Sequence, residues 1–241
     1  MRSALNLGLK LVAALLVWGQ GAAASAQQVQ PYKEPRAFTW GELALLPEYC
    51  RDVQGVLYNV HGEGKDSPRA PYWVGLMGDD FWHMHHYCLG RREILRASQP
   101  GLAPVLRKGL LQRATQEYLY VVRNSRPTMP VMPEVYYKLG EAHLLLDNTV
   151  AAMDAFAAAR KLKPDYWPAY TRWIDVLLST KQTDEALKLA REGLVYAPDS
   201  AELKQRAAAA ERDARKPSRP APVRSSGSGG TGGAAAAASA P

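Results

Sequence analysis

The sequence is poor in cysteine and lacks the common catalytic motifs. Its 241 residues include two cysteines and no C-x-x-C pair, which argues against a thiol–disulfide redox enzyme. G-x-S-x-G, H-E-x-x-H and a glycine-rich phosphate loop are also missing, and these are signatures of hydrolases, zinc proteases and nucleotide-binding enzymes. We therefore predict a non-enzymatic protein without a catalytic residue, a resident metal or a cofactor.

The net charge of +7 arises near the two ends of the chain. Without the basic residues at positions 2, 10, 215, 216, 219 and 224, 24 basic side chains stand against 23 acidic ones. A nearly neutral body offers no broad surface for neutralising phosphates. We therefore expect no nucleic-acid partner.

Residues 1–26 have the organisation of a cleaved signal peptide. Arg2 and Lys10 give a positive start, an eight-residue apolar run extends from Leu11 to Trp18, and Ala24-Ser25-Ala26 has the small residues of a cleavage site. Eight apolar residues cannot cross a bilayer of about 30 Å, and no later window contains eighteen apolar residues in a row. We predict an exported protein, periplasmic or secreted, that begins at Gln27 and has no stable membrane span after cleavage.

Export changes the interpretation of Cys50 and Cys88, because exported compartments are oxidising. We predict a disulfide between them. Closing a loop of roughly 38 residues would stabilise the fold by about 4 kcal/mol on the chain-entropy model. The alternative is two separately buried thiols.

Two adjacent segments of 34 residues, 133–166 and 167–200, repeat the same pattern. Proline ends each segment's last helical run, and Asp147-Asn148 and residues 181–184 mark a turn inside each segment. The aligned pairs include Tyr136 with Tyr170, Leu139 with Trp173, Ala152 with Ala186, Ala159 with Gly193, and Pro164 with Pro198. The pattern resembles the tetratricopeptide repeat, a helix–turn–helix unit of this length.

The first segment carries Leu139-Gly140 and Phe156 at the places where that family has its signature residues. The second departs from the signature, with Ile174 where glycine is usual and Ala190 where an aromatic residue is usual. The resemblance implies an all-α fold, a short helical solenoid in which neighbouring hairpins bury each other's apolar faces.

Further segments should cover both ends of the two repeats. Residues 79–132 predict a degenerate hairpin, with helices at 79–97 and 110–127 and an insertion in 98–109. Residues 37–78 predict an irregular N-terminal cap, in which Thr39 and Glu42 form a capping box and Pro47 starts a second short helix. Asp199-Ser200 should cap an end helix over 201–215, and the composition of 216–241 predicts a disordered tail.

The resemblance also implies a concave groove that binds a peptide or helix of another protein, here an envelope or periplasmic protein. Glutamate and aspartate at the groove positions predict an acidic, partly aromatic groove that prefers a basic or apolar segment. The groove positions carried over from the family are Tyr137, Glu141, Leu144, Leu145, Thr171, Asp175 and Leu178.

Residues 78–88 suggest an alternative, because they contain three of the five histidines. On a continuous helix, Asp79, His83 and His86 would lie on one face and could share a metal ion. A periplasmic metal-binding protein or metal chaperone is therefore the second hypothesis. Packing of an irregular end repeat explains the same residues without a ligand. An enzyme site within residues 37–88 is a third hypothesis.

The predicted bridge can be tested on exported protein. Alkylation without reductant, followed by intact mass measurement, should show that neither Cys50 nor Cys88 is modified. Two alkylated thiols in exported material would contradict the bridge.

Overall fold

The computed structural model describes residues 38–53 and 67–215, and every regular element in these ranges is a helix. The all-α class predicted from the sequence is thus confirmed for this part of the chain. The predicted signal peptide and the predicted tail lie outside the described residues. The elements are α1 (Trp40–Ala44), η1 (Glu48–Arg51), α3 (Ala70–Met77), η2 (Gly78–His83), α4 (Met84–Ala97), α5 (Pro104–Asn124), α6 (Met132–Leu145), α7 (Thr149–Leu162), α8 (Trp167–Ser179), α9 (Thr183–Tyr196) and α10 (Ala201–Ala214).

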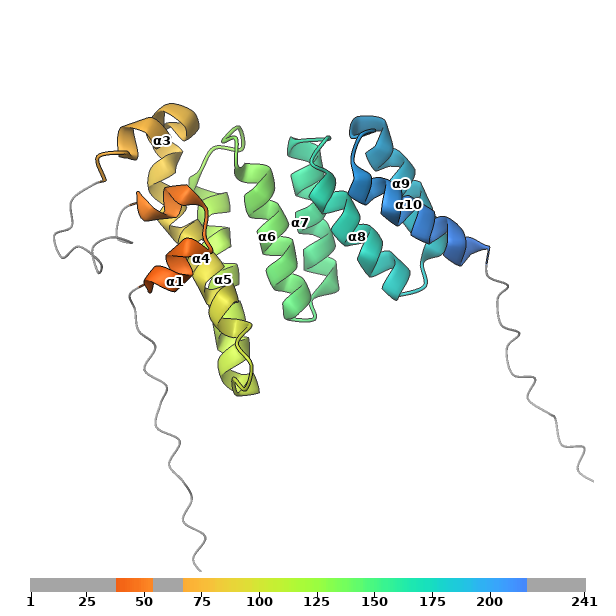
Figure 1. Ribbon diagram of the computed structural model, residues 1–241, viewed down its shortest axis with the longest axis horizontal. Coiled ribbons are helices and arrows are strands. Elements are labelled where there is room, and N and C mark those ends of the chain that lie inside the picture. Colours follow the sequence, from red (N-terminus) through yellow and green to blue (C-terminus); the bar gives the residue numbers. More distant parts are fainter. Residues whose placement is uncertain (1–37, 54–66, 216–241) are drawn as a thin grey trace, which may run out of the picture. The chain divides into compact units, whose positions relative to one another are not determined.

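The helices from α4 onward pack mainly against their neighbours in the chain (Figure 1). The most extensive contacts join α4 with α5 and α6 with α7, and α8 and α9 form a further pair. Contacts of α5 with α6 and of α7 with α8 join one pair to the next, and α10 packs on both α8 and α9. Among the described residues, no helix has the length and hydropathy needed to cross a bilayer.

The spacing of the C-terminal helices follows the 34-residue period of the sequence. The starts of α7 and α9, and also their ends, are 34 residues apart, as are the starts of α8 and α10. The turns inside the two hairpins match as well, because Asp147 (φ 59°) and Lys181 (φ 62°) both have left-handed backbone conformation. Equal sequence spacing therefore corresponds to equal local geometry.

A glycine on one helix of each pair faces an aromatic ring on the other helix. A Cβ atom added at Gly140 of α6 would lie 2.5 Å from a ring carbon of Phe156 on α7, well inside van der Waals contact. In the pair of α8 and α9 the glycine lies on the second helix and the aromatic residue on the first. The three contacts are Gly90–Tyr118, Gly140–Phe156 and Gly193–Tyr170.

The structure differs from the sequence predictions in the first hairpin and in the cap. Much of the predicted insertion is helical, because α5 begins at Pro104 and runs to Asn124. Proline is favourable in a first helical turn, where its missing N–H has no partner to lose. The cap contains one more helix than predicted, α3, and residues 78–83 form a 3-10 helix instead of the first turns of α4.

The predicted helix caps are present. Thr39 accepts a hydrogen bond from the Glu42 N–H, and the Glu42 side chain accepts one from the Thr39 N–H, so the capping box is complete. Ser200 accepts a hydrogen bond from the Leu203 N–H at the start of α10. These side chains satisfy N–H groups that a helix start leaves without partners.

The N-terminal cap is attached to α4 by a disulfide and by a buried ion pair. The predicted bridge between Cys50 and Cys88 is present, with 5.6 Å between the Cα atoms. Arg96 of α4 donates to both carboxylate oxygens of Glu42, over 2.5 and 3.1 Å. Both charges are largely removed from solvent, since the Arg96 and Glu42 side chains are 6% and 14% exposed.

Asp52 joins the two described parts of the cap. Its side chain is 7% exposed and accepts hydrogen bonds from the Ser67 hydroxyl at 2.6 Å and the Trp73 indole N–H at 2.7 Å. Both carboxylate oxygens are thus bonded although they are buried, as a buried charge requires. Residues 38–53 are in this way fixed to α3.

The glycine contacts predict opposite effects of alanine at two helical positions. Gly140→Ala should lower the free energy of unfolding by about 1–3 kcal/mol, because the added methyl group overlaps the Phe156 ring. Gly109→Ala in α5 is the matched control, since a Cβ atom there meets nothing within 4 Å. It should raise stability by up to about 1 kcal/mol through helix propensity. Equal effects in urea unfolding would contradict the close contact.

The Glu42–Arg96 pair predicts a dependence of stability on pH. Burial alone would raise the pKa of Glu42, but hydrogen bonds from Arg96 and Thr39 outweigh burial and lower this pKa below its ordinary value of 4.5. A carboxylate with a lowered pKa stabilises the fold above pH 4.5, and this contribution is lost as the pH falls through the folded-state pKa.

Glu42→Gln should therefore lower the free energy of unfolding by about 1–3 kcal/mol at pH 7, with a smaller difference from wild type below pH 4.5. Glu48→Gln removes a carboxylate that is 61% exposed and pairs with Arg69 at the surface, and it should change stability little at either pH. Urea unfolding at pH 7 and pH 4 measures both. A Glu42→Gln penalty that persists unchanged at pH 4 would refute the assignment.

Candidate functional site: the polar face of α4, α6, α8 and α10

The first helix of each pair, together with α10, carries a set of charged side chains that we call the polar face. On α6 and α8 these side chains are three or four residues apart, so they lie on the same side of their helix. The polar face consists of Arg91 on α4, Glu134, Lys138 and Glu141 on α6, Arg172 and Asp175 on α8, and Arg206 on α10.

Contacts between helices show that these residues belong to neighbouring parts of one surface. Arg206 donates to both carboxylate oxygens of Asp175, over 3.0 and 3.3 Å, and so joins α10 to α8. Glu134 accepts a hydrogen bond from the Tyr87 hydroxyl at 2.5 Å, and its carboxylate lies 3.8 Å from Arg91. These contacts join α6 to α4.

Two half-buried tyrosines occupy the middle of the polar face. The ring centres of Tyr137 and Tyr166 are 5.9 Å apart, and the Tyr137 hydroxyl donates to Glu141 at 3.1 Å. Burial, and then the Glu141 carboxylate, raises the pKa of Tyr137 above its ordinary value. Burial, and then the Glu134 carboxylate, does the same to the pKa of Tyr166. Both hydroxyls therefore stay protonated and can donate hydrogen bonds.

The structure places three of the predicted groove residues, Tyr137, Glu141 and Asp175, on or against the polar face. Thr171 is buried with 7% exposure, and its hydroxyl donates to the Pro168 carbonyl within the same helix. A partner cannot reach it without a change in α8, so Thr171 is a poor contact residue.

The three predicted groove leucines are arranged differently from one another. Leu144 packs against the cluster around Phe156, and Leu178 packs against the cluster around Ile174, so both are partly buried. Leu145 is 50% exposed and follows Glu141 by four residues on α6. Of these leucines, Leu145 offers the most surface to a partner.

The expectation of an acidic groove does not match the charge distribution. Glu141 accepts a hydrogen bond from Lys138 at 2.7 Å, and Asp175 is bonded to Arg206. The sequence analysis overlooked these partners, although Lys138, Arg172 and Arg206 are 34 residues apart. A basic residue repeated at the period of the hairpins was the available signal.

The histidine-rich segment does not form the predicted set of metal ligands. Gly78–His83 is a 3-10 helix, so Asp79 does not share an α-helical register with His86. The His86 ring stacks on Tyr120 with 3.6 Å between centres, and its Nδ1 lies 2.5 Å from a Glu117 oxygen. Within residues 38–53 and 67–215, no three histidine, cysteine, aspartate or glutamate side chains are placed to hold a metal ion.

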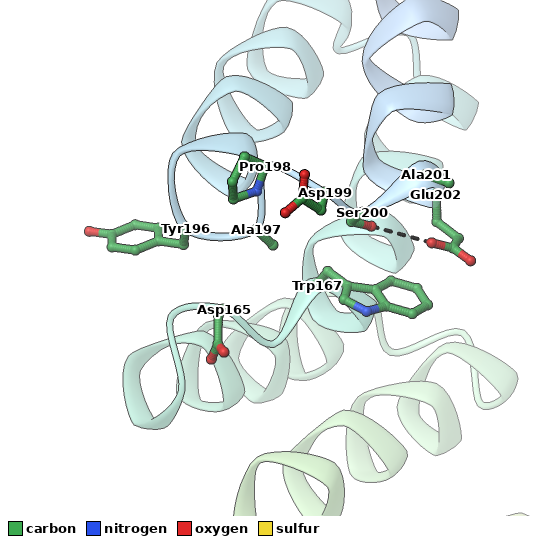
Figure 2. A pocket seen from close by; sticks show the side chains of 9 residues that line it. All are labelled: Asp165, Trp167, Tyr196, Ala197, Pro198, Asp199, Ser200, Ala201 and Glu202. Atoms are coloured by element: carbon green, nitrogen blue, oxygen red, sulfur yellow. Dashed lines mark hydrogen bonds between the residues drawn. The ribbon is translucent and has the colours of Figure 1, made fainter.

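A cavity of about 550 Å³ lies where the turns after α7 and α9 come together (Figure 2). Its walls combine two partly exposed aromatic rings, Trp167 and Tyr196, with three carboxylates. In Figure 2 the Tyr196 ring points away from Trp167, so the two rings do not face a common position. The complete lining is Asp165, Trp167, Tyr196, Ala197, Pro198, Asp199, Ser200, Ala201 and Glu202.

Helix capping accounts for part of this acidic lining. Ser200 is the N-cap of α10, and its hydroxyl donates to Glu202, which lies in the first turn of the helix (Figure 2). Carboxylates at a helix start are stabilised by the helix dipole without any ligand. The polar face, which crosses several helices, is therefore the stronger candidate site.

Comparison with known proteins gives no family for this chain. No protein-family model matches it, and no curated protein matches it. The resemblance to tetratricopeptide repeats therefore depends on the residues of the chain itself.

Proposed function

We propose that this protein is a non-enzymatic, exported interaction module that holds a peptide or helix of another envelope protein against its polar face. The observation that carries the proposal is the group of half-buried tyrosine and arginine side chains that continues across α4, α6, α8 and α10. Tyrosine and arginine are the residue types enriched among the energetically dominant residues of protein interfaces.

The proposed architecture is a short tetratricopeptide-like solenoid. The 34-residue spacing of the helices, the matched turns at Asp147 and Lys181 and the glycine–aromatic contacts support it. In such an array each hairpin contacts only its neighbours, and the first helices together form one extended binding surface. The polar face has the position expected of that surface.

The side chains of the polar face are already held in place by one another. Tyr137 is bonded to Glu141, and Arg206 is bonded to Asp175. Binding therefore costs little additional side-chain entropy, which favours affinity. This order within a partly exposed surface is typical of a preformed docking site.

Export is supported by the signal-type N-terminus and by the disulfide. A bridge between Cys50 and Cys88 persists in an oxidising compartment and is rare in a reducing cytosol. The partner we propose is consequently another protein of the envelope or the exterior.

Site-specific crosslinking in cells tests this function. A photoreactive amino acid at Leu145, which is 50% exposed on the side of α6 that carries Glu141, should capture a defined protein. The same amino acid at Val195, which is 76% exposed on α9, is the matched control and should not capture that protein. Mass spectrometry of the crosslinked peptides should map one continuous segment of the partner.

Replacing both Tyr137 and Tyr166 by alanine should reduce capture at Leu145 by about tenfold or more, because two interface tyrosines are removed. Tyr72→Ala, in the exposed part of the cap, should leave capture unchanged. Helicity of both variants is checked by circular dichroism. Two results would refute the proposed binding face. One is equal capture of the partner from positions 145 and 195, and the other is capture at position 145 that does not fall when Tyr137 and Tyr166 are both replaced.

A further inference from the structure

Arg172 is the one charged residue of the polar face whose side chain forms no hydrogen bond or ion pair with any residue that the structure describes. It lies half-buried on α8, three residues before Asp175. Its Nε is shielded from solvent and has no hydrogen-bond partner. A guanidinium group has five N–H donors, and leaving a buried donor without a partner is unfavourable.

Two carboxylates of the face, those of Glu141 and Asp175, are bonded to other groups. One oxygen of Glu141 accepts from the Tyr137 hydroxyl and the other accepts from Lys138. Arg206 binds both oxygens of Asp175. Neither of these carboxylates is bonded to Arg172, although Asp175 lies only three residues further along α8.

The 34-residue period explains how this arrangement arises. Lys138, Arg172 and Arg206 occupy equivalent positions on α6, α8 and α10. Arg206 reaches back to the carboxylate of the preceding unit, Asp175. The same reach from Arg172 would lead to Glu141, but Lys138 already binds that carboxylate from within α6.

The surroundings of Arg172 are suited to a side chain of a partner. The positive charge of Arg172 lowers the pKa of Tyr137, against the larger raising effects of burial and of the Glu141 carboxylate. The Tyr137 and Tyr166 rings, with 5.9 Å between their centres, supply apolar surface on the same face. A ligand there can bury its stem against the rings and pair its charged end with Arg172.

We propose that Arg172 binds the carboxylate of an aspartate or glutamate side chain in the segment held by the polar face. This inference rests on the proposed function and specifies the chemistry of its partner. It reverses the preference for a basic segment predicted from Glu141 and Asp175 alone. The polar face contains four cations and three carboxylates, so its net charge is +1. One added carboxylate brings this charge to zero, whereas a phosphate, with nearly two negative charges, would exceed it.

Peptide selection on the purified full chain tests the proposal. The probe is a library of random twelve-residue peptides displayed with their C-termini fused to a coat protein, so that only side chains carry carboxylates. Peptides selected on the wild-type chain should be enriched in aspartate or glutamate at one position. Arg172→Gln should abolish this enrichment. Arg191→Gln on α9, an exposed arginine outside the polar face, is the matched control and should preserve it.

Fluorescence anisotropy on a selected peptide, synthesised with an amidated C-terminus, then measures the contact. Arg172→Gln should weaken binding by about tenfold or more, and Arg172→Lys should weaken it less because the charge is kept. Changing the acidic residue of the peptide to its amide should weaken binding to the wild-type chain equally. That change should have no further effect on Arg172→Gln.

The outcomes separate this inference from the proposed function. Peptides that require Tyr137 and Tyr166 but show no acidic preference, or that bind Arg172→Gln as tightly as wild type, would overturn the role of Arg172 and leave the binding face intact. Failure to select peptides that require Tyr137 and Tyr166 would count against the binding face itself, and against the inference that depends on it.

Discussion

The close approach of paired helices is the constraint on which the arrangement of the described helices depends. It is possible because a glycine of one helix lies against an aromatic ring of the other, as Gly140 does against Phe156. In the pair of α8 and α9, Ile174 stands in place of that glycine, and the close contact is between Tyr170 of the first helix and Gly193 of the second. Both pairs therefore contain a glycine–aromatic contact, but at different positions of the repeat. Equal spacing within the pairs in turn brings the charged sides of α6, α8 and α10 into register.

The N-terminal cap supports one end of the same polar face. Tyr49 of the cap lies against Tyr87 of α4, with 6.0 Å between ring centres, and the Tyr87 hydroxyl is bonded to Glu134. Burial raises the pKa of Tyr49 and of Tyr87 well above the ordinary value, so both remain neutral in the core. Tyr49 and Tyr87 therefore connect the cap to Glu134 of the polar face. The disulfide and the hydrogen bonds of Asp52 help to fix the position of the cap.

Most of the helix boundaries could be predicted from the sequence, because they depend on local chemistry. Pro164 and Pro198 end helical runs, Thr39 and Ser200 cap helix starts, and each acts on its own backbone neighbourhood. The departures occur where tertiary packing decides. In the segment from residue 78 to residue 88, Phe81, Met84 and Cys88 are completely buried, and their packing with the cap accompanies the 3-10 geometry. A helical spacing rule for Asp79 and His86 could not anticipate that change.

The candidate site was predictable in position and less so in charge. The 34-residue period places Tyr137, Glu141 and Asp175 near a common surface. Two cations could bind Glu141: Lys138 on the same helix, and Arg172 at the equivalent position of the next unit. The length and direction of their side chains decide between them. Lys138 lies three residues before Glu141 on the same helix and forms the bond at 2.7 Å. The sequence contains both residues but does not rank them.

The burial of the disulfide has a consequence for the order in which the protein assembles. Cys50 and Cys88 are both 0% exposed, within the cluster that also contains Tyr87 and Met84. An oxidising enzyme or small oxidant cannot reach sulfur atoms enclosed in this way, so the thiols can be joined only while the segment before α4 is open. Formation of the bond and any later exchange of it therefore both require this segment to be detached at that moment.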